Sequence, residues 1–163
     1  MEDIDALLAL AQISVAFAGF SSIVVLFNRR DLAEWHALDT TRFRVMLLAS
    51  LMAGFFAVLP LPLYKLRMPI DLLWSISSAA LAVCLASGAI VHFRARPLFG
   101  PRSVLWPIFQ IAFWVAFVVQ LLNIGSVGYH HEAGPYIFGV LWLLFQAGWQ
   151  FYRLVLSSNQ SPA

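Results

Sequence analysis

The sequence predicts an all-α protein, a polytopic membrane helix bundle with five transmembrane helices, its N-terminus outside and its C-terminus in the cytoplasm. Of its 163 residues, 61% are hydrophobic and 11% are charged, whereas soluble globular chains have about 45–50% and about 25%. The charged residues leave five uncharged stretches of at least 20 residues, and about 20 helical residues cross the ~30 Å hydrocarbon core of a bilayer. This composition excludes a water-soluble fold and favours a single membrane domain over residues 1–163.

The first expected span covers residues 4–27 and follows a short acidic segment. A secretory signal peptide begins with positive charge, so we expect this helix to be retained. The second span covers residues 43–64, with Pro60 and Pro62 in its last turn. The third, over residues 70–93, follows after a short connection, so these two helices should form an antiparallel hairpin.

The fourth expected span covers residues 104–125, and the fifth covers residues 135–156. Trp106 and Pro107 open the fourth span, where proline is tolerated because a first-turn N–H has no helical partner. Glycines lie in the loop between these two spans, and a polar tail follows the fifth span.

The connection between the first two spans has a pattern of its own and predicts a short interfacial helix over residues 31–39. Asp31 and Glu34 resemble a capping box. Three apolar residues recur at a spacing of three: Leu32, Trp35 and Leu38. We expect this helix to lie on the membrane surface. A docking site for a cytoplasmic partner is the alternative.

Lys and Arg residues set the expected orientation, because cytoplasmic loops carry an excess of positive charge. One set of alternate loops has two such residues, Lys65 and Arg67. The other set has eight: Arg29, Arg30, Arg42, Arg44, Arg94, Arg96, Arg102 and Arg153. This bias places the C-terminus in the cytoplasm, and we expect a multi-pass protein of a bacterial inner (plasma) membrane.

Small residues recur every four positions on faces of the first three spans. Lipid supplies no hydrophobic drive for helix packing, so close approach through such faces takes its place. The residues expected to pack helices together are Ser14, Ala18, Ser22, Ala49, Ala53, Ala57, Ala80, Cys84 and Gly88. They pack either inside one subunit, which is the favoured interpretation, or between the subunits of an oligomer.

Amides and tryptophans are the polar groups that remain at membrane depth. No Asp, Glu, Lys or Arg lies centrally in a span, which argues against a proton-coupled transporter, a voltage sensor and a hydrolase with a carboxylate base. The residues that would line a polar pore or pocket are Gln110, Trp114, Gln120, Trp142, Gln146 and Gln150. The competing interpretation is that the amides hydrogen-bond the helices to one another.

The expected depth of these side chains in the bilayer suggests which of them hydrogen-bond to one another. Gln110 and Gln150 share a depth if the last two spans are each centred in the bilayer, as do Trp114 and Gln146. We therefore expect Gln110 and Gln150 to hydrogen-bond across these helices. The competing expectation is that Gln146 and Gln150, four residues apart, bond to each other and leave Gln110 facing another helix or lipid.

No motif carries catalytic, cofactor or metal chemistry with useful specificity, so we lean against an enzyme and expect no cofactor and no metal. Cys84 has no second cysteine in the chain to pair with. A weak metal site at His130, His131 and Glu132 is a minor alternative. The chain has no basic stripe, so nucleic acid is not an expected partner.

Three classes of function fit these expectations. The favoured one is a homo-oligomeric channel or membrane-permeabilising protein, because small helix faces and several amides occur without a soluble domain. An accessory or scaffold subunit of a larger membrane complex is the alternative, and a redox or ligand-binding membrane module is the third. The expected partners are the lipid bilayer and either further copies of the chain or another membrane protein.

Overall fold

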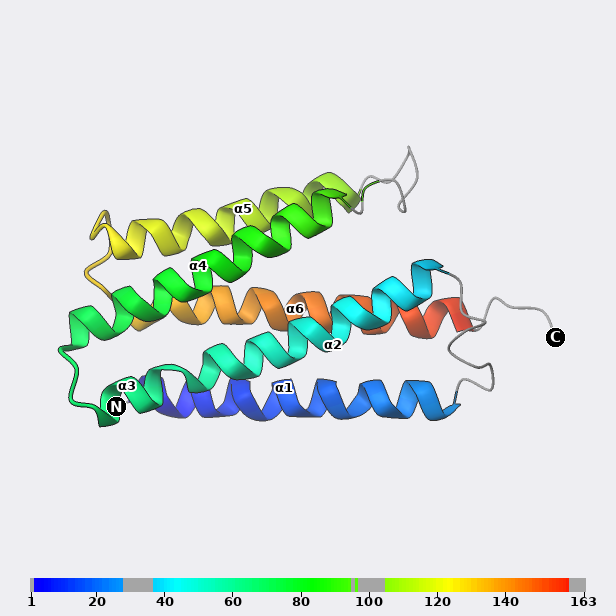
Figure 1. Cartoon of the computed structure of the whole chain (residues 1–163), viewed down its shortest axis with the longest axis horizontal. Coiled ribbons are helices and arrows are strands. Elements are labelled where there is room, and N and C mark those ends of the chain that lie inside the picture. The colour runs from blue at the N-terminus through cyan, green and yellow to red at the C-terminus, as the bar shows by residue number, and fades with distance from the viewer. Residues whose placement is uncertain (1, 28–36, 95, 97–104, 159–163) are drawn as a thin grey trace. The chain divides into compact units, whose positions relative to one another are not determined.

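The chain is helical in the part that the structure describes. This computed structural model describes residues 2–27, 37–94, 96 and 105–158, and those ranges contain no β-strand. The helices are α1 (Glu2–Phe27), α2 (Ala37–Val58), α3 (Pro60–Lys65), α4 (Ile70–Arg94), α5 (Leu105–Ile124) and α6 (Ala133–Ser158) (Figure 1). The prediction of an all-α protein is confirmed.

Two compact units make up the chain. Unit 1 contains Met1–Ala57 and Leu143–Ala163, and unit 2 contains Val58–Trp142. The helix α6 therefore begins in unit 2 and ends in unit 1. The prediction of a single domain over residues 1–163 stays a prediction.

Four segments of the described chain are long and apolar enough to cross a membrane. They are Asp3–Phe20, Asp39–Lys65, Ile70–Arg94 and Trp106–Ile124. The helix α6 has 26 residues and is also long enough, but its glutamines, glycines and arginine make it less apolar. The chain thus has the helices of a multi-pass membrane protein.

The second span departs from the continuous helix expected over residues 43–64. The helix α2 begins earlier, at Ala37, and ends at Val58, and α3 begins at Pro60 after a turn at Leu59. Proline has no N–H to donate and its ring clashes with the preceding turn, so it opens a new helix instead of continuing the old one. The other four long helices begin and end within two residues of the expected bounds.

The expected interfacial helix over residues 31–39 falls mostly outside the described residues. Residues 31–36 lie outside them, and residues 37–39 form the start of α2. Asp39 occupies the first turn of α2, where the helix dipole favours negative charge. Arg42 Nη1 donates to Asp39 Oδ1 at 2.8 Å.

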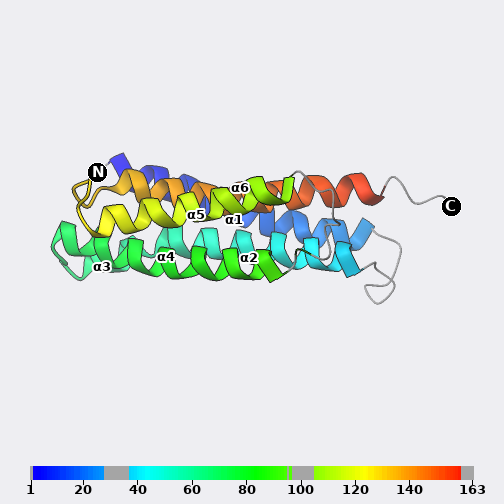
Figure 2. The same cartoon turned by 90° about the horizontal axis from the view of Figure 1, so that it is seen from above.

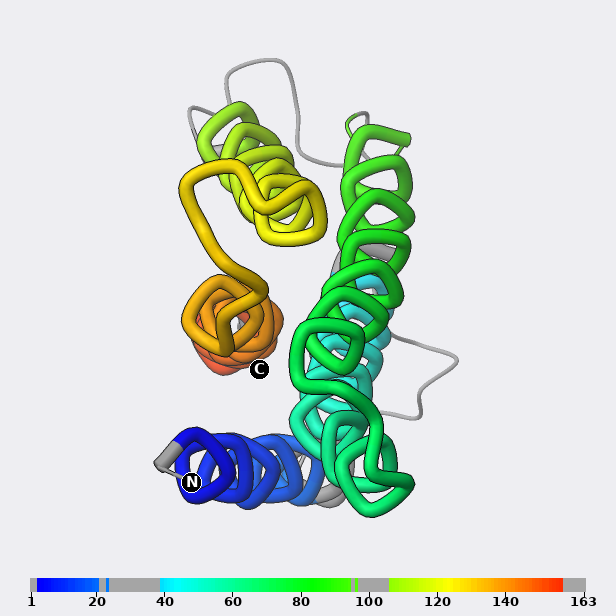
Figure 3. The backbone as a smooth tube through the Cα atoms, turned by 90° about the vertical axis from the view of Figure 1, so that its left-hand side faces the viewer, coloured from blue at the N-terminus to red at the C-terminus, as the bar shows by residue number. Residues whose placement is uncertain are grey.

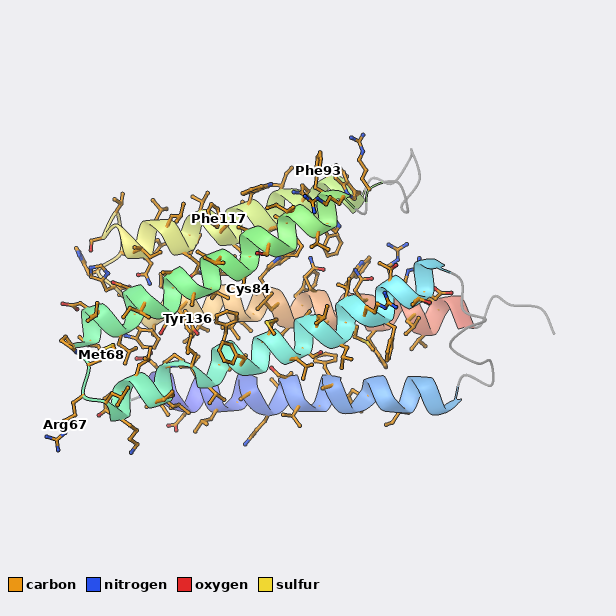
Figure 4. The ribbon with its side chains drawn as sticks, viewed as in Figure 1. Arg67, Met68, Cys84, Phe93, Phe117 and Tyr136 are labelled. Carbon is orange, nitrogen blue, oxygen red and sulfur yellow. The ribbon has the colours of Figure 1, made fainter. Side chains whose placement is uncertain are left out.

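In unit 2, α4 and α5 lie side by side and run in opposite directions (Figure 1). The short α3 lies beside the start of α4 (Figure 2). A tight turn joins these two helices: the Arg67 N–H donates to the Tyr64 carbonyl at 2.9 Å. Arg67 has a φ of 57°, and its side chain extends away from the helices (Figure 4).

A glycine lets α4 and α5 approach closely at one point. A Cβ added to Gly88 on α4 would stand 2.8 Å from Cε1 of Phe113 on α5, well inside van der Waals contact. Phe113 is 7% exposed, so its ring has little space to move into. Gly88 is therefore placed where a small residue is required.

In unit 1, small residues of α1 and α2 meet directly. A Cβ added to Gly54 would lie 3.3 Å from the Cβ of Ser14, and Ser14 is 2% exposed. The Ser14 hydroxyl donates back to the Leu10 carbonyl at 2.8 Å. This bond satisfies the hydroxyl within its own helix, so the buried serine leaves the packing surface apolar.

The small residues expected to pack helices have two degrees of burial. Three are buried, namely Ser14, Ala53 and Ala57, and five are half-buried, namely Ala18, Ala49, Ala80, Cys84 and Gly88. The side chain of Ser22 lies outside the described residues. The use of the half-buried residues, inside one subunit or between subunits, stays a prediction.

Gly88→Ala should destabilise the protein by about 1–3 kcal/mol, because the added methyl group overlaps the Phe113 ring. Unfolding of the purified protein in mild detergent, followed by circular dichroism, measures the change. Ser87→Ala is the matched control, because Ser87 is exposed and its hydroxyl donates back to the Val83 carbonyl of the same helix. Equal stability of the two variants would contradict the close approach.

Candidate functional site

Four polar side chains of unit 2 lie near the loop that joins α5 to α6, and we call them the polar cluster: Ser77, Ser78, Gln120 and Asn123. Each is 0% exposed. Figure 3 shows the chain leaving α5 and turning through this loop into α6. A polar group buried without a hydrogen bond costs about 1–3 kcal/mol, so the partners of these four side chains decide what the cluster does.

Asn123 joins the end of α5 to α4 and to the start of α6. Its Nδ2 donates to the Ser78 hydroxyl and to the Glu132 carbonyl, each at 3.0 Å. Its Oδ1 accepts the Glu132 N–H at 3.0 Å. Because a backbone N–H can only donate, this last bond fixes the orientation of the amide. One buried side chain thereby closes the loop.

Gln120 lies one turn before Asn123 and contacts α6. Its Nε2 donates to the Pro135 carbonyl at 2.7 Å. The absence of a side chain at Gly139 makes room for this contact, because a Cβ there would stand 2.8 Å from Gln120 Nε2 and 2.7 Å from Leu81 Cδ2. The glycine therefore allows three helices of unit 2 to meet around an amide.

Two atoms of the polar cluster have no hydrogen-bond partner among the described residues: Gln120 Oε1 and Ser77 Oγ. Both belong to fully buried side chains. On α6, Tyr136 is also 0% exposed, and its ring packs against Trp74 with 5.7 Å between centroids. Each of the two unpaired oxygens can accept a further hydrogen bond.

His131 connects the same loop to α4 by a second route. Its Nδ1 lies 2.9 Å from Ser75 Oγ, and its Nε2 lies 2.6 Å from Ser126 Oγ. Ser75 donates its own proton to the Asp71 carbonyl at 2.7 Å, so it accepts from His131 Nδ1. Both ring nitrogens are engaged in closing the loop.

At the opposite end of the α4–α5 pair, His92 and Gln110 form what we call the clamp. Gln110 Nε2 donates to the Ala89 carbonyl at 3.3 Å, which leaves Oε1 to accept from His92 Nδ1 at 3.0 Å. Trp106 Nε1 donates to the His92 carbonyl at 3.3 Å, and the two rings stack at 5.9 Å. The Arg96 guanidinium lies 4.9 Å from the centroid of the Trp106 ring, in the range of a cation–π contact.

The hydrogen bonds of Gln110 run to His92 and Ala89 on α4, within unit 2. Depth paired Gln110 with Gln150, which belongs to unit 1, and that pairing stays a prediction. The depth argument compared α5 only with the helix that follows it in the chain, although α4, which precedes it, is also a short connection away.

The two tryptophans of the expected pore or pocket have different surroundings. Trp114 is 43% exposed and packs edge-on against Phe117 of its own helix, with 5.6 Å between centroids. Trp142 packs against Phe109 and Phe113, at 5.9 and 5.5 Å. Trp114 therefore lies on an outward side of α5, while Trp142 packs among the aromatic residues of α5.

Gln146 and Gln150 lie one turn apart on α6, in unit 1. They are 2% and 5% exposed. Gln146 Nε2 and Gln150 Oε1 have no hydrogen-bond partner among the described residues, so these two atoms do not bond to each other. Like the polar cluster, this pair of buried amides has hydrogen-bonding capacity that its described neighbours do not use.

Gln12 differs from the other amides of the long helices that the structure describes, because its side chain is exposed. It lies within the Asp3–Phe20 span of α1, of which 17% is buried, whereas the other three candidate spans are 28–39% buried. An exposed amide at membrane depth has to find its partner outside the subunit.

Sequence reasoning missed two residues of these sites, Ser78 and Gly139. Ser78 bonds a residue 45 positions away, so no local pattern marks it. Gly139 did carry a signal, because an isolated glycine inside an apolar helix usually has a packing reason. Its contacts with α4 and α5 required the fold.

The chemistry that these residues offer is hydrogen bonding by neutral amides, hydroxyls and imidazoles. No three His, Cys, Asp or Glu side chains come together as a metal site in the part of the chain that the structure describes. Comparison with known proteins finds no matching family model, no matching curated protein and no matching solved structure. We therefore infer the function from the positions of the polar residues in the structure.

Gln110→Leu and His92→Leu should be non-additive in stability, because each removes the same hydrogen bond. We expect a coupling free energy of about 0.6–2 kcal/mol from a double-mutant cycle of unfolding in mild detergent, the range measured for such bonds between membrane helices. Gln110→Leu combined with Ser87→Ala is the control pair, and its effects should add. A coupling free energy no larger than that of the control pair would show that Gln110 and His92 do not hydrogen-bond to each other.

Proposed function

We propose that the protein works as a homo-oligomer in the membrane, assembled along α1, and that this assembly is a channel or a membrane-permeabilising complex. The exposed amide of Gln12 is the observation that supports this function best. It is a polar side chain inside an apolar helix, on a surface that the subunit itself leaves uncovered.

Helical geometry places Gln12 opposite the side by which α1 packs. The packing side carries Leu7, Leu10 and Ser14, which are at most 7% exposed. At about 100° per residue, the exposed side around Gln12 carries one acid, three small residues and two larger apolar ones: Asp5, Ala9, Ala16, Gly19, Leu8 and Val15. We call this surface the α1 face.

The physical reason for association is the environment of the amide. An amide in hydrocarbon loses its water partners, which costs several kcal/mol unless another polar group reaches it. The small residues Ala9, Ala16 and Gly19 allow a second helix to approach closely on one part of this face, so van der Waals contact and an amide–amide hydrogen bond form together. A second copy of the chain presents the same face at the same depth, so Gln12 meets its own equivalent in a symmetric contact.

A ring of copies gathers the polar side of α1 toward one axis. Asp5 and Gln12 are two turns apart on the α1 face, so a ring would line its axis with carboxylates and amides, as cation pores do. The hydrogen bonds of Gln110 and Gln120 inside unit 2 support this choice, because those amides already have helix partners. The α1 face is the better candidate for a pore lining.

We also infer that α6 is a fifth span, with the N-terminus outside and the C-terminus in the cytoplasm of a bacterial inner membrane. The 26 residues of α6 make about 39 Å of helix. Its lower hydropathy fits a helix whose polar side is covered, since Gln146 and Gln150 are at most 5% exposed. A fifth crossing also gathers the arginine-rich loops on one side of the membrane.

A reporter fused after Ala163 should be cytoplasmic, and a reporter fused at Gly128 should be external, because α6 crosses the membrane between them. One reporter that is active only outside and one that fluoresces only inside make the measurement at each site. A fusion within residues 28–36 is the control and should report the cytoplasm. The same side for Gly128 and Ala163 would show that α6 is not a span.

A cysteine at position 12 should crosslink one chain to another. In a Cys84→Ser background, oxidation of Gln12→Cys in native membranes should give a covalent dimer. Ile13→Cys is the matched control, because it lies about 100° around the helix and should crosslink far less. Gln12→Leu should shift the purified particle toward the monomer in mild detergent, as measured by light scattering.

Three results would change the proposal. A monomeric particle with no crosslink at position 12 contradicts assembly along α1. An oligomer that carries no ion or solute flux in reconstituted vesicles would contradict the channel function but would still support assembly along α1. A particle in which a different membrane protein covers the α1 face identifies the alternative function, an accessory or scaffold subunit.

A further inference from the structure

Two serines and a histidine of unit 2 form a connected row of hydrogen bonds between α4 and the loop that follows α5. Ser126 Oγ lies 2.6 Å from His131 Nε2, and His131 Nδ1 lies 2.9 Å from Ser75 Oγ. Ser75 in turn donates to the Asp71 carbonyl at 2.7 Å. All four residues belong to the same unit, so these distances define one arrangement.

The bond from Ser75 to the helix backbone sets the direction of the row. Because the Ser75 proton goes to the Asp71 carbonyl, Ser75 Oγ accepts from His131 Nδ1. A neutral imidazole that carries its proton on Nδ1 has its lone pair on Nε2, and Nε2 is the atom that Ser126 contacts. In its neutral form, His131 can therefore take the proton of the Ser126 hydroxyl.

These three side chains have the relative positions that a nucleophilic serine requires. Such a serine needs a base at about 2.6–3.2 Å and a third group that orients the base. His131 occupies the position of the base, and Ser75 occupies the position of the orienting group. Ser126 is exposed, whereas His131 and Ser75 are half-buried. The hydroxyl that would react is thus the one that a substrate can reach.

The backbone holds both members of the serine–histidine contact in an unusual conformation. Among the described residues, three that are not glycine have a positive φ, and two of them are Ser126, at 53°, and His131, at 55°. The end of α5 imposes this conformation on Ser126, because the next N–H, that of Val127, donates back to the Leu122 carbonyl at 3.0 Å. Glycine is the usual residue at such a position, and strained residues of other types gather at functional sites.

We propose that Ser126 is a nucleophilic serine that cleaves esters, with His131 as its general base and Ser75 as a positioning residue. Ser126 Oγ attacks the ester carbonyl carbon while its proton passes to His131 Nε2, and the alcohol takes this proton as its C–O bond breaks. Water then attacks the acyl group, gives a proton to His131, and the imidazole returns a proton to Ser126 Oγ as the acid leaves. This activity is independent of assembly along α1.

A fluorophosphonate probe tests the serine in the purified full chain. The Oγ–P bond forms, fluoride leaves, and mass spectrometry of the peptides locates the adduct, which should lie on Ser126. His131→Gln should slow the labelling by about 100-fold, because the base is lost. His130→Gln is the matched control, since His130 is an exposed histidine of the same loop, and it should leave the rate unchanged.

Hydrolysis of p-nitrophenyl acetate tests the substrate class. The unmodified protein should release nitrophenolate, and Ser126→Ala should lose this activity. Ser87→Ala is the matched control, because Ser87 is an exposed serine whose hydroxyl donates to the Val83 carbonyl of its own helix. Circular dichroism verifies that each variant is folded.

Ser75→Ala tests the positioning role. Without the hydroxyl the imidazole loses its orienting partner, so the labelling rate should fall by about tenfold. Ser75→Thr keeps a hydroxyl at this position and should restore most of the rate, which a general loss of stability would not allow. Equal rates for Ser75→Ala and the unmodified protein would show that Ser75 does not position the ring.

Three results would overturn the proposal. The absence of an adduct on Ser126 would show that this serine is not a nucleophile. An adduct that forms equally fast in His131→Gln would show that the histidine only closes the loop. Ester hydrolysis that is absent from the unmodified protein, or that persists in Ser126→Ala, would show that Ser126 does not cleave esters.

Discussion

The need to satisfy polar groups without water governs this structure more than any other interaction. In hydrocarbon, a donor or acceptor that leaves water has to find a partner within the protein or in a neighbouring molecule. Ser14 and Ser50 meet the need locally, by donating to carbonyls one turn back in their own helices. Asn123 meets it across elements, with three hydrogen bonds that reach α4 and the start of α6.

Close approach of helices follows from the same need. An amide on one helix reaches a carbonyl on the next only where the side chains between them are short. Gly139 provides that space beside Gln120, and Gly88 provides it beside Phe113. The glycines and the amides of unit 2 therefore act together: the glycine sets the distance between the helices, and the hydrogen bond sets how they are positioned along each other.

Groups that the subunit does not satisfy point to what surrounds it. Gln12 is an exposed amide on a helix with little cover, and a neutral donor–acceptor pair is best matched by another amide.

The sequence by itself determined the helical class and most helix ends, because charges, glycines and prolines end apolar helices wherever they occur. It also contained the break before Pro60, since a proline lacks the N–H that would continue α2, although we expected a continuous span there. Only the tertiary structure decided which face of each helix is covered. Four of the five long helices, α1, α2, α4 and α5, have no strong periodic pattern that would mark an inward face. For that reason the bond from Gln110 to His92, the bond from Asn123 to Ser78 and the exposure of Gln12 became visible only once the helices were packed.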